Sequence, residues 1–295
     1  MEALRRKKRT ICLFVLPALI AYLAVSTFPI LASTAMSFFK WNVAGNQGWI
    51  GLKNYMQLFT IDDIFKGSVQ HVLYAMLLCV AIQMPLAILL AYLLTRTRHG
   101  RNAFKVMFFM PNMISTSAIG ILWMFVYNLN FGLLNSLLKA LGLGDYVMPW
   151  LGETSTALTC VIVVACWQYI GYHMIIYLCA MQSIPQSINE AAAIDGANAW
   201  QTFWRITFPM LIPILKVDMI LITTGSLRMF DIVYVMTNGG PIHSTEMIAT
   251  HMYTRTFRGL QFGYGSAMAV ILTLMCVLIT IILNASFKRI ERTID

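Results

Sequence analysis

The sequence predicts an all-α, polytopic membrane helical bundle, because it is rich in apolar residues, poor in charge and divided into long apolar stretches. Of its 295 residues, 59% are hydrophobic and 11% are charged, and the mean hydropathy is +0.71. Soluble domains carry about 25% charged residues, so a chain of this composition could not cover a water-facing surface. The net charge of +9 is weak evidence for a nucleic-acid partner, because its placement fits membrane orientation instead.

Six stretches are long enough to span a bilayer as helices, which requires about 18 apolar residues. We expect them at residues 11–39, 69–95, 106–129, 157–184, 212–236 and 263–287. The first is roughly twice as long as the apolar run of a signal peptide, so we expect it to be retained. The first three contain proline, which kinked membrane helices tolerate.

The Lys and Arg residues predict the orientation of these spans. Fourteen of the 21 lie on the same side as the N-terminus, six lie on the opposite side, and Arg228 lies within the fifth span. By the positive-inside rule, both termini are cytoplasmic. The expected domains are a basic N-terminus at 1–10, a transmembrane domain at 11–287 and a tail at 288–295.

The loop between the fourth and fifth spans, residues 183–213, is too polar to span the membrane and carries helix signals. Ser183 can cap a first helix, with Pro185 in its opening turn. This helix should continue through Ala193 and end at the following Asp195-Gly196, since glycine favours helix termination.

A second short helix is expected after that turn. Asn198 followed three residues later by Gln201 resembles a capping box, and Pro209 and Pro213 mark the exit toward the fifth span. The three alanines at 191–193 make one face of the first helix thin, which suits docking into a groove of another protein. The alternative is a surface hairpin that only joins two spans.

These residues resemble the EAA loop, which marks the membrane subunits of bacterial binding-protein-dependent ABC importers. The resemblance lies in Glu190, Ala191, Ala192, Asp195, Gly196, Ile206 and Pro209. It implies the type I importer permease fold in the bacterial cytoplasmic (inner) membrane, with the loop docked on an ATPase. It also implies partners, namely two ATPase subunits, a second and different permease subunit, and an extracytoplasmic sugar-binding protein.

Further segments resemble the carbohydrate-importing branch of this family, in particular the maltose and glycerol-phosphate type of subunit with an N-G-G-P segment. They are Gly51-Leu52-Lys53-Asn54-Tyr55, Gly132-Leu133-Leu134-Asn135, Trp167 to Tyr172, Phe230-Asp231 and Thr237-Asn238-Gly239-Gly240-Pro241. The resemblance implies that this chain forms half of the pore through which a sugar or oligosaccharide crosses the membrane.

Polar and aromatic residues within the fourth and fifth spans are the candidate substrate-lining groups. The fourth span carries Trp167, Gln168, Tyr169 and Tyr172, whose rings and polar tips suit a sugar. Their alternative role is to satisfy neighbouring helices. By resemblance, Ser226 and Met229 of the fifth span line a sugar site, although Met229 departs from the polar residue of the maltose type.

Arg228 and Asp231 stand three residues apart in the fifth span. We expect them to neutralise each other as a pair, in preference to a sugar contact by Arg228.

Several motifs are absent. No G-x-x-x-x-G-K-[ST] occurs, so the chain has no Walker A phosphate cradle, and no H-E-x-x-H or G-x-S-x-G suggests a hydrolase. The six cysteines lie in apolar stretches without a C-x-x-C pair, which favours free thiols over disulfides or zinc. We therefore expect a non-catalytic transport subunit with no cofactor and no metal.

The alternative function is an ion-gradient-driven secondary transporter of a small polar solute, for which Asp218 or Asp231 could carry protons. Such proteins usually show internal repeats and broken helices, and neither is evident from the sequence. A non-transporting assembly subunit is a third possibility.

Overall fold

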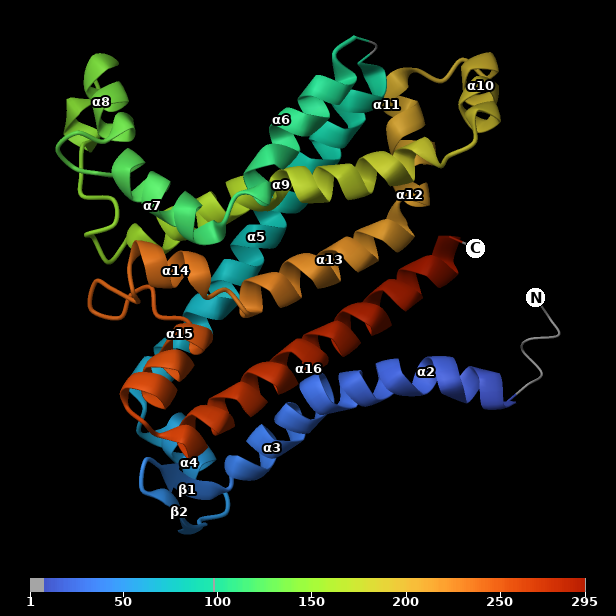
Figure 1. Cartoon of the computed structure of the whole chain (residues 1–295). Coiled ribbons are helices and arrows are strands. Elements are labelled where there is room, and N and C mark those ends of the chain that lie inside the picture. The colour runs from blue at the N-terminus through green and yellow to red at the C-terminus, as the bar shows by residue number, and fades with distance from the viewer. Residues whose placement is uncertain (1–7, 98, 295) are drawn as a thin grey trace. The chain divides into compact units, whose positions relative to one another are not determined.

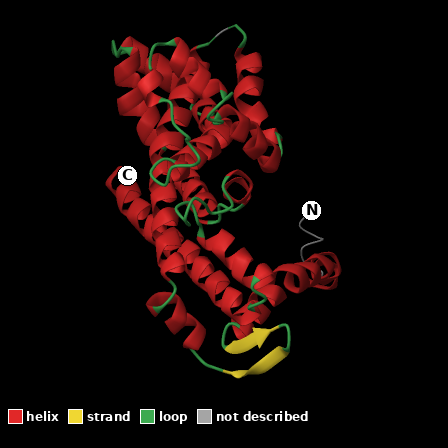
Figure 2. Ribbon diagram, turned by 90° about the vertical axis from the view of Figure 1, so that its left-hand side faces the viewer, coloured by secondary structure: helices red, strands yellow, loops and turns green. Residues whose placement is uncertain are grey.

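The computed structural model describes residues 8–97 and 99–294, so the basic residues 1–7 lie outside the described part of the chain. Helices dominate the described residues, as Figures 1 and 2 show, and the predicted all-α membrane fold is confirmed. By its internal contacts the chain divides into two compact units. Among the described residues, those up to 63 together with 252–271 form the first, and those from 64 to 251 together with those from 272 onward form the second.

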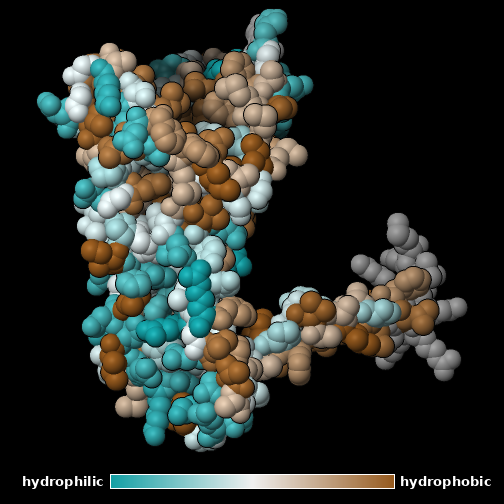
Figure 3. Space-filling model, turned by 60° about the vertical axis from the view of Figure 1, so that its left-hand side comes forward, coloured by the Kyte–Doolittle hydropathy of each residue, from teal (hydrophilic) through white to brown (hydrophobic). Residues whose placement is uncertain are grey.

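The first unit begins with the predicted first span, which is continuous apart from a π-helical turn. Helix α2 (Lys8–Tyr22), the π-turn η1 (Leu23–Thr27) and α3 (Phe28–Met36) follow one another. Within this span, Leu13–Met36 is apolar enough to cross a membrane and buries none of its most apolar window. In Figure 3 the helices of this span, at lower right, carry mostly brown and pale side chains, which are hydrophobic to neutral. Such a surface suits lipid or another membrane protein.

A small β-hairpin follows, which the sequence did not predict. Strands β1 (Phe39–Asn42) and β2 (Gly45–Trp49) pair antiparallel, and α4 (Lys53–Thr60) comes next. Asn54 ties the two together, because its buried amide donates to the carbonyls of Ser37 and Phe39. The hairpin appears in yellow in Figure 2.

The second unit is built around α9 (Ala157–Gln182), the most buried of the candidate spans among the described residues. It packs closely on α6 (Arg101–Met113), and a Cβ added at Gly171 would lie 1.9 Å from the Phe108 carbonyl oxygen. Only glycine fits at this crossing. Near the C-terminal end of α9, Tyr177 and Met181 share an apolar core with Ala91 of α5 (Asp63–Arg96).

The third predicted span is broken, which is a correction to the single kinked helix expected at 106–129. Helices α6 and α7 (Thr116–Val126) meet at an angle of 97°, with Ile114 and Ser115 extended between them. The carbonyl oxygen of Ile114 is satisfied by the amide of Gln168 at 3.4 Å. Broken backbone at membrane depth requires such partners, and this one is remote in sequence.

The remaining spans follow the prediction with local differences. The fifth contains α13 (Ile212–Leu227) and α14 (Asp231–Met236), which are separated by a short non-helical link. Helix α16 (Phe262–Ile294) continues beyond the expected end of the sixth span into the expected tail. In all, the described residues hold five helices long and apolar enough to span, or six if the bent pair counts as one.

The loop after α14 is held in shape by hydrogen bonds before α15 (Ile248–Tyr253) and the π-turn η4 (Thr254–Arg258). Thr245 bonds to the Thr237 hydroxyl at 2.7 Å and to the Gly240 carbonyl at 2.8 Å. The buried Glu246 accepts from Thr250 and contacts the ring of His243. The backbone turns through four residues with positive φ: Asn238, Gly239, Ile242 and His243.

Candidate functional site

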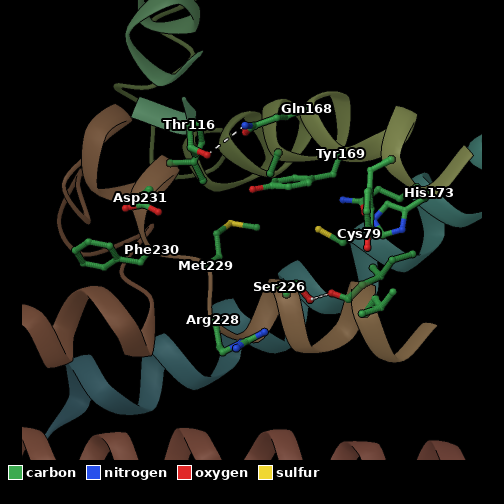
Figure 4. A pocket seen from close by; sticks show the side chains of 17 residues that line it. Cys79, Thr116, Gln168, Tyr169, His173, Ser226, Arg228, Met229, Phe230 and Asp231 are labelled. Atoms are coloured by element: carbon green, nitrogen blue, oxygen red, sulfur yellow. Dashed lines mark hydrogen bonds between the residues drawn. The ribbon is translucent and has the colours of Figure 1, made fainter. Parts of the chain in front are cut away.

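A cavity of about 280 Å³ lies in the second unit between α5, α7, α9, α13 and α14. Figure 4 shows side chains from these elements pointing into it. The sequence predicted five of its lining residues, which are Gln168, Tyr169, Tyr172, Ser226 and Met229. The structure therefore brings residues of two different spans to one place.

Gln168 is the central polar group of this wall. Its side chain is 1% exposed, and its Nε2 donates to Thr116 Oγ1 at 3.2 Å as well as to the Ile114 carbonyl. Its Oε1 has no hydrogen-bond partner among the described residues. A buried amide oxygen without a partner is costly, so this atom is suited to accept a hydrogen bond from a ligand or water in the cavity.

Two tyrosines and a histidine extend the wall along α9. Tyr169 and Tyr172 are 39% and 38% exposed, so their rings are available to a ligand. His173 is buried, and its Nδ1 lies 2.6 Å from Asp218 Oδ1 of α13. This pair joins α9 to α13 directly behind the cavity.

On the α13 side of the cavity, the hydroxyl of Ser226 is already bonded to the backbone of its own helix. The Ser226 hydroxyl donates to the backbone carbonyls of Ile222 and Thr223, so its hydrogen is already used. Met229, in the link between the two helices, points into the space opposite Tyr169 (Figure 4).

The expected pair of Arg228 and Asp231 does not form. Arg228 Nε donates instead to the Thr224 carbonyl at 3.2 Å, and no ion pair joins the two residues in the described part of the chain. The break between α13 and α14 removes the helical spacing on which the prediction depended. Both residues line the cavity instead.

The structure places Trp167 elsewhere. It contacts Trp123 edge-on at 5.5 Å and lines a separate apolar cavity beside Pro111 and Ile170. The sequence reasoning also missed Cys79, Gln83 and Thr116 of the main cavity. Gln83 could have been found, because an amide within an apolar span is a signal of a polar partner or cavity.

The loop at 183–213 folds as the predicted pair of short helices. Helix α10 (Gln186–Ile194) ends in a left-handed turn at Gly196, which has a φ of +75°. The Ala197 and Gly196 amides donate back to the carbonyls of Ala192 and Ala193, which forms a Schellman motif. Ser183 is not the N-cap, because Pro185 takes that place and Ser183 ends α9.

The second helix carries the predicted capping box. Asn198 and Gln201 exchange side-chain-to-backbone hydrogen bonds of 2.9 Å at the start of α11 (Ala199–Thr202). The π-turn η3 (Phe203–Thr207) and α12 (Phe208–Met210) then lead into α13. Ile206 and Pro209 are half-buried in this connection.

Most of the residues with an expected ATPase contact are exposed. They are Glu190, Ala191, Asp195 and Gly196, whereas Ala192 is 5% exposed and packs inward. The sequence prediction did not assign Ile194 and Trp200 to this contact, although Trp200 belongs to the segment that resembles the EAA loop, and they are 86% and 70% exposed beside this turn. Large apolar side chains this exposed suit a protein partner.

Comparison with known proteins places the chain among transport components. Residues 83–295 match the family model described as "Binding-protein-dependent transport system inner membrane component". The chain is 35% identical over 278 residues to the probable ABC transporter permease protein YurN of Bacillus subtilis, covering 94% of this chain and 95% of that protein. It is 33% identical over 270 residues to AmyD of Thermoanaerobacterium thermosulfurigenes, a probable starch degradation products transport system permease, covering 92% and 91%.

The fold has a counterpart of known structure. A chain of a bacterial ABC transporter involved in the import of the acidic polysaccharide alginate superposes with a TM-score of 0.85. The sequence identity is 24%, and the match covers 98% of this chain and 99% of that one.

Proposed function

The chain belongs to the family of binding-protein-dependent transport system inner membrane components, and from this we propose that it forms half of the pore of an ATP-driven sugar importer. It is a transport subunit and not an enzyme, in agreement with the sequence prediction. The proposed cargo is a sugar or oligosaccharide, and the proposed location is the bacterial cytoplasmic membrane. The relative named for starch degradation products supports the cargo.

One observation carries the proposal: the exposed helical hairpin joins two of the helices that line the cavity, α9 and α13. Helix α9 enters the hairpin at Ser183, and α13 leaves it after Leu211. His173 and Asp218 link these helices between the cavity and the hairpin. A displacement of the hairpin by a partner would therefore be transmitted to the cavity wall through short, connected elements.

We assign the ATPase contact to the exposed part of the helical hairpin formed by residues 183–213. The contact residues are Glu190, Ala191, Asp195 and Gly196, together with Ile194 and Trp200. Glu190 is oriented by Gln186, whose amide donates to it at 2.8 Å.

The cavity is small and open, so a second, different permease subunit would complete the substrate site. The binding protein would deliver sugar from the outer side.

The first test replaces Gly196 by proline. Gly196→Pro removes both the positive φ and the 3.1 Å amide bond to Ala193, and so deforms the turn. We expect the reconstituted complex to hydrolyse ATP while sugar uptake falls by about tenfold or more, because the deformed hairpin transmits motion poorly. Glu190→Ala should act in the same direction.

The chain offers a matched control. Gly142 has a φ of +76°, no neighbour within 4 Å of an added Cβ, and a 3.1 Å amide bond to Lys139, but it lies outside the hairpin. Gly142→Pro should preserve the ratio of sugar transported to ATP hydrolysed. Unchanged uptake in both hairpin variants, or uptake that stops with a protonophore while ATP persists, would contradict the proposal.

A further inference from the structure

Helix α8 (Leu133–Ala140) buries the polar side chain of Asn135 while it leaves several leucines exposed. Asn135, at 2% exposure, donates to the carbonyls of Asn128, Leu129 and Met148. Its Oδ1 accepts a 2.8 Å hydrogen bond from the indole of Trp150. This amide therefore fixes α8 on the adjacent loops through hydrogen bonds.

The opposite face presents leucines to the surroundings. Leu133, Leu137 and Leu141 are 69%, 53% and 65% exposed. Because they are spaced four residues apart, they form one stripe along the helix and its C-cap. A soluble protein would place this stripe inward and Asn135 outward, so the surroundings of α8 differ from bulk water.

The leucine stripe follows directly in the chain on exposed apolar rings of the bent span in the same unit. Phe131, 64% exposed, precedes α8, and its ring lies 6.3 Å from that of Phe125. Phe125 is 60% exposed on α7, the second half of the bent span. Exposed apolar rings therefore lie both on α7 and immediately before α8. Figure 1 shows α8 following α7 along the chain.

The composition of this surface fits lipid better than a protein partner. Protein interfaces are enriched in aromatic residues, Met and Arg and poor in Lys, whereas the stripe itself consists of three leucines with Lys139 exposed on the same helix. Lys139, exposed on α8, and Tyr146, 61% exposed beyond it, are residue types that anchor elements at the headgroup level.

We propose that α8 is an interfacial helix that lies on the bilayer leaflet opposite the basic N-terminus, with its leucine stripe among the lipid chains. Short amphipathic helices bind in this way, with the apolar face at the boundary between headgroups and chains. The hydrogen bonds of Asn135 then fix the loop that follows α7 to the membrane surface.

The test uses a photo-crosslinking residue in the assembled transporter. The variant Leu137→p-benzoylphenylalanine is reconstituted in vesicles of phosphatidylethanolamine and phosphatidylglycerol and irradiated, and adducts are identified by mass spectrometry. The control carries the same residue at Glu153, which is exposed in the turn before α9. We expect roughly ten times more lipid adduct at 137 than at 153.

A second probe at Leu141, the C-cap of α8, keeps the test decisive if the first variant misfolds. It should give the same lipid adduct. Three results would overturn the proposal. They are a crosslink from both probes to the second membrane subunit, a crosslink from both to the binding protein, and lipid adduct no greater than at position 153.

Discussion

At the scale of single residues, Gln168 has one observed role and one proposed role, and its sequence context does not separate the two. Its amide nitrogen satisfies the carbonyl exposed by the break between α6 and α7, while its oxygen is left without a partner at the cavity. One side chain thus satisfies a broken helix and, in our proposal, accepts a hydrogen bond from the ligand. The broken helix and the proposed binding site are consequently linked through one residue.

Replacing this amide should weaken substrate binding. Removal of one hydrogen bond to a ligand costs about 1–1.5 kcal/mol, so Gln168→Leu should raise the half-saturating sugar concentration about tenfold. The measurement is the concentration dependence of uptake in proteoliposomes. Gln182→Leu, at the exposed end of the same helix, should leave that concentration unchanged. An unaltered value for Gln168→Leu would exclude contact between this residue and the sugar.

Other residue-level features show what the sequence can and cannot predict. The capping box at Asn198 and the turn at Gly196 were predictable, because each depends on residues within four positions of each other. The separation of Arg228 from Asp231 was not, because it depends on a helix break that carries no proline or glycine signal. The inward packing of Ala192 likewise depends on tertiary contacts.

At the scale of elements, α6 and α9 pack closely at Gly171. Gly171 allows the backbone of α6 to contact α9 directly, as small residues do at many membrane helix interfaces. The predicted spans were reliable because apolar length is a local property. The 97° bend was not predicted, because the amide that satisfies it comes from position 168, far along the chain.

The α6–α9 contact yields a stability prediction. Gly171→Ala would place a methyl group 1.9 Å from the Phe108 carbonyl, so the helices must separate, at an expected cost of about 1–3 kcal/mol. The midpoint temperature of thermal unfolding of the purified protein in detergent measures this loss of stability. Gly225→Ala is the control, because it also lies within a spanning helix and meets no atom within 4 Å.

The two glycine variants should change the unfolding temperature in different directions. Gly225→Ala should preserve or slightly raise it, since alanine favours helices by about 0.5–1 kcal/mol relative to glycine. Equal midpoints for both variants would show that α6 and α9 do not pack this closely in the protein.

At the scale of the whole molecule, the distribution of Lys and Arg predicts the orientation that the proposed mechanism requires. The hairpin must face the ATPase, and α8 must face the opposite side. Both conditions hold if the N-terminus is cytoplasmic, as the basic residues indicate.

Cysteine labelling tests this orientation directly. In a variant whose native cysteines are replaced by serine, Lys139→Cys should react with a membrane-impermeant maleimide in right-side-out vesicles. Arg205→Cys, also exposed, should react only after the vesicles are opened. The reverse pattern would place the hairpin outside and would contradict an ATPase contact.

The loop from Thr237 to Glu246 has a thermodynamic consequence for association. Its threonine, histidine and glutamate contacts hold the backbone in place, and a side chain at Gly239 would collide with Glu246 at 2.3 Å. A preformed loop loses little conformational entropy when it contacts another molecule, so more of the contact energy is retained as affinity. Substitutions that loosen it should therefore weaken the complex, even where they remove no atom from the contact itself.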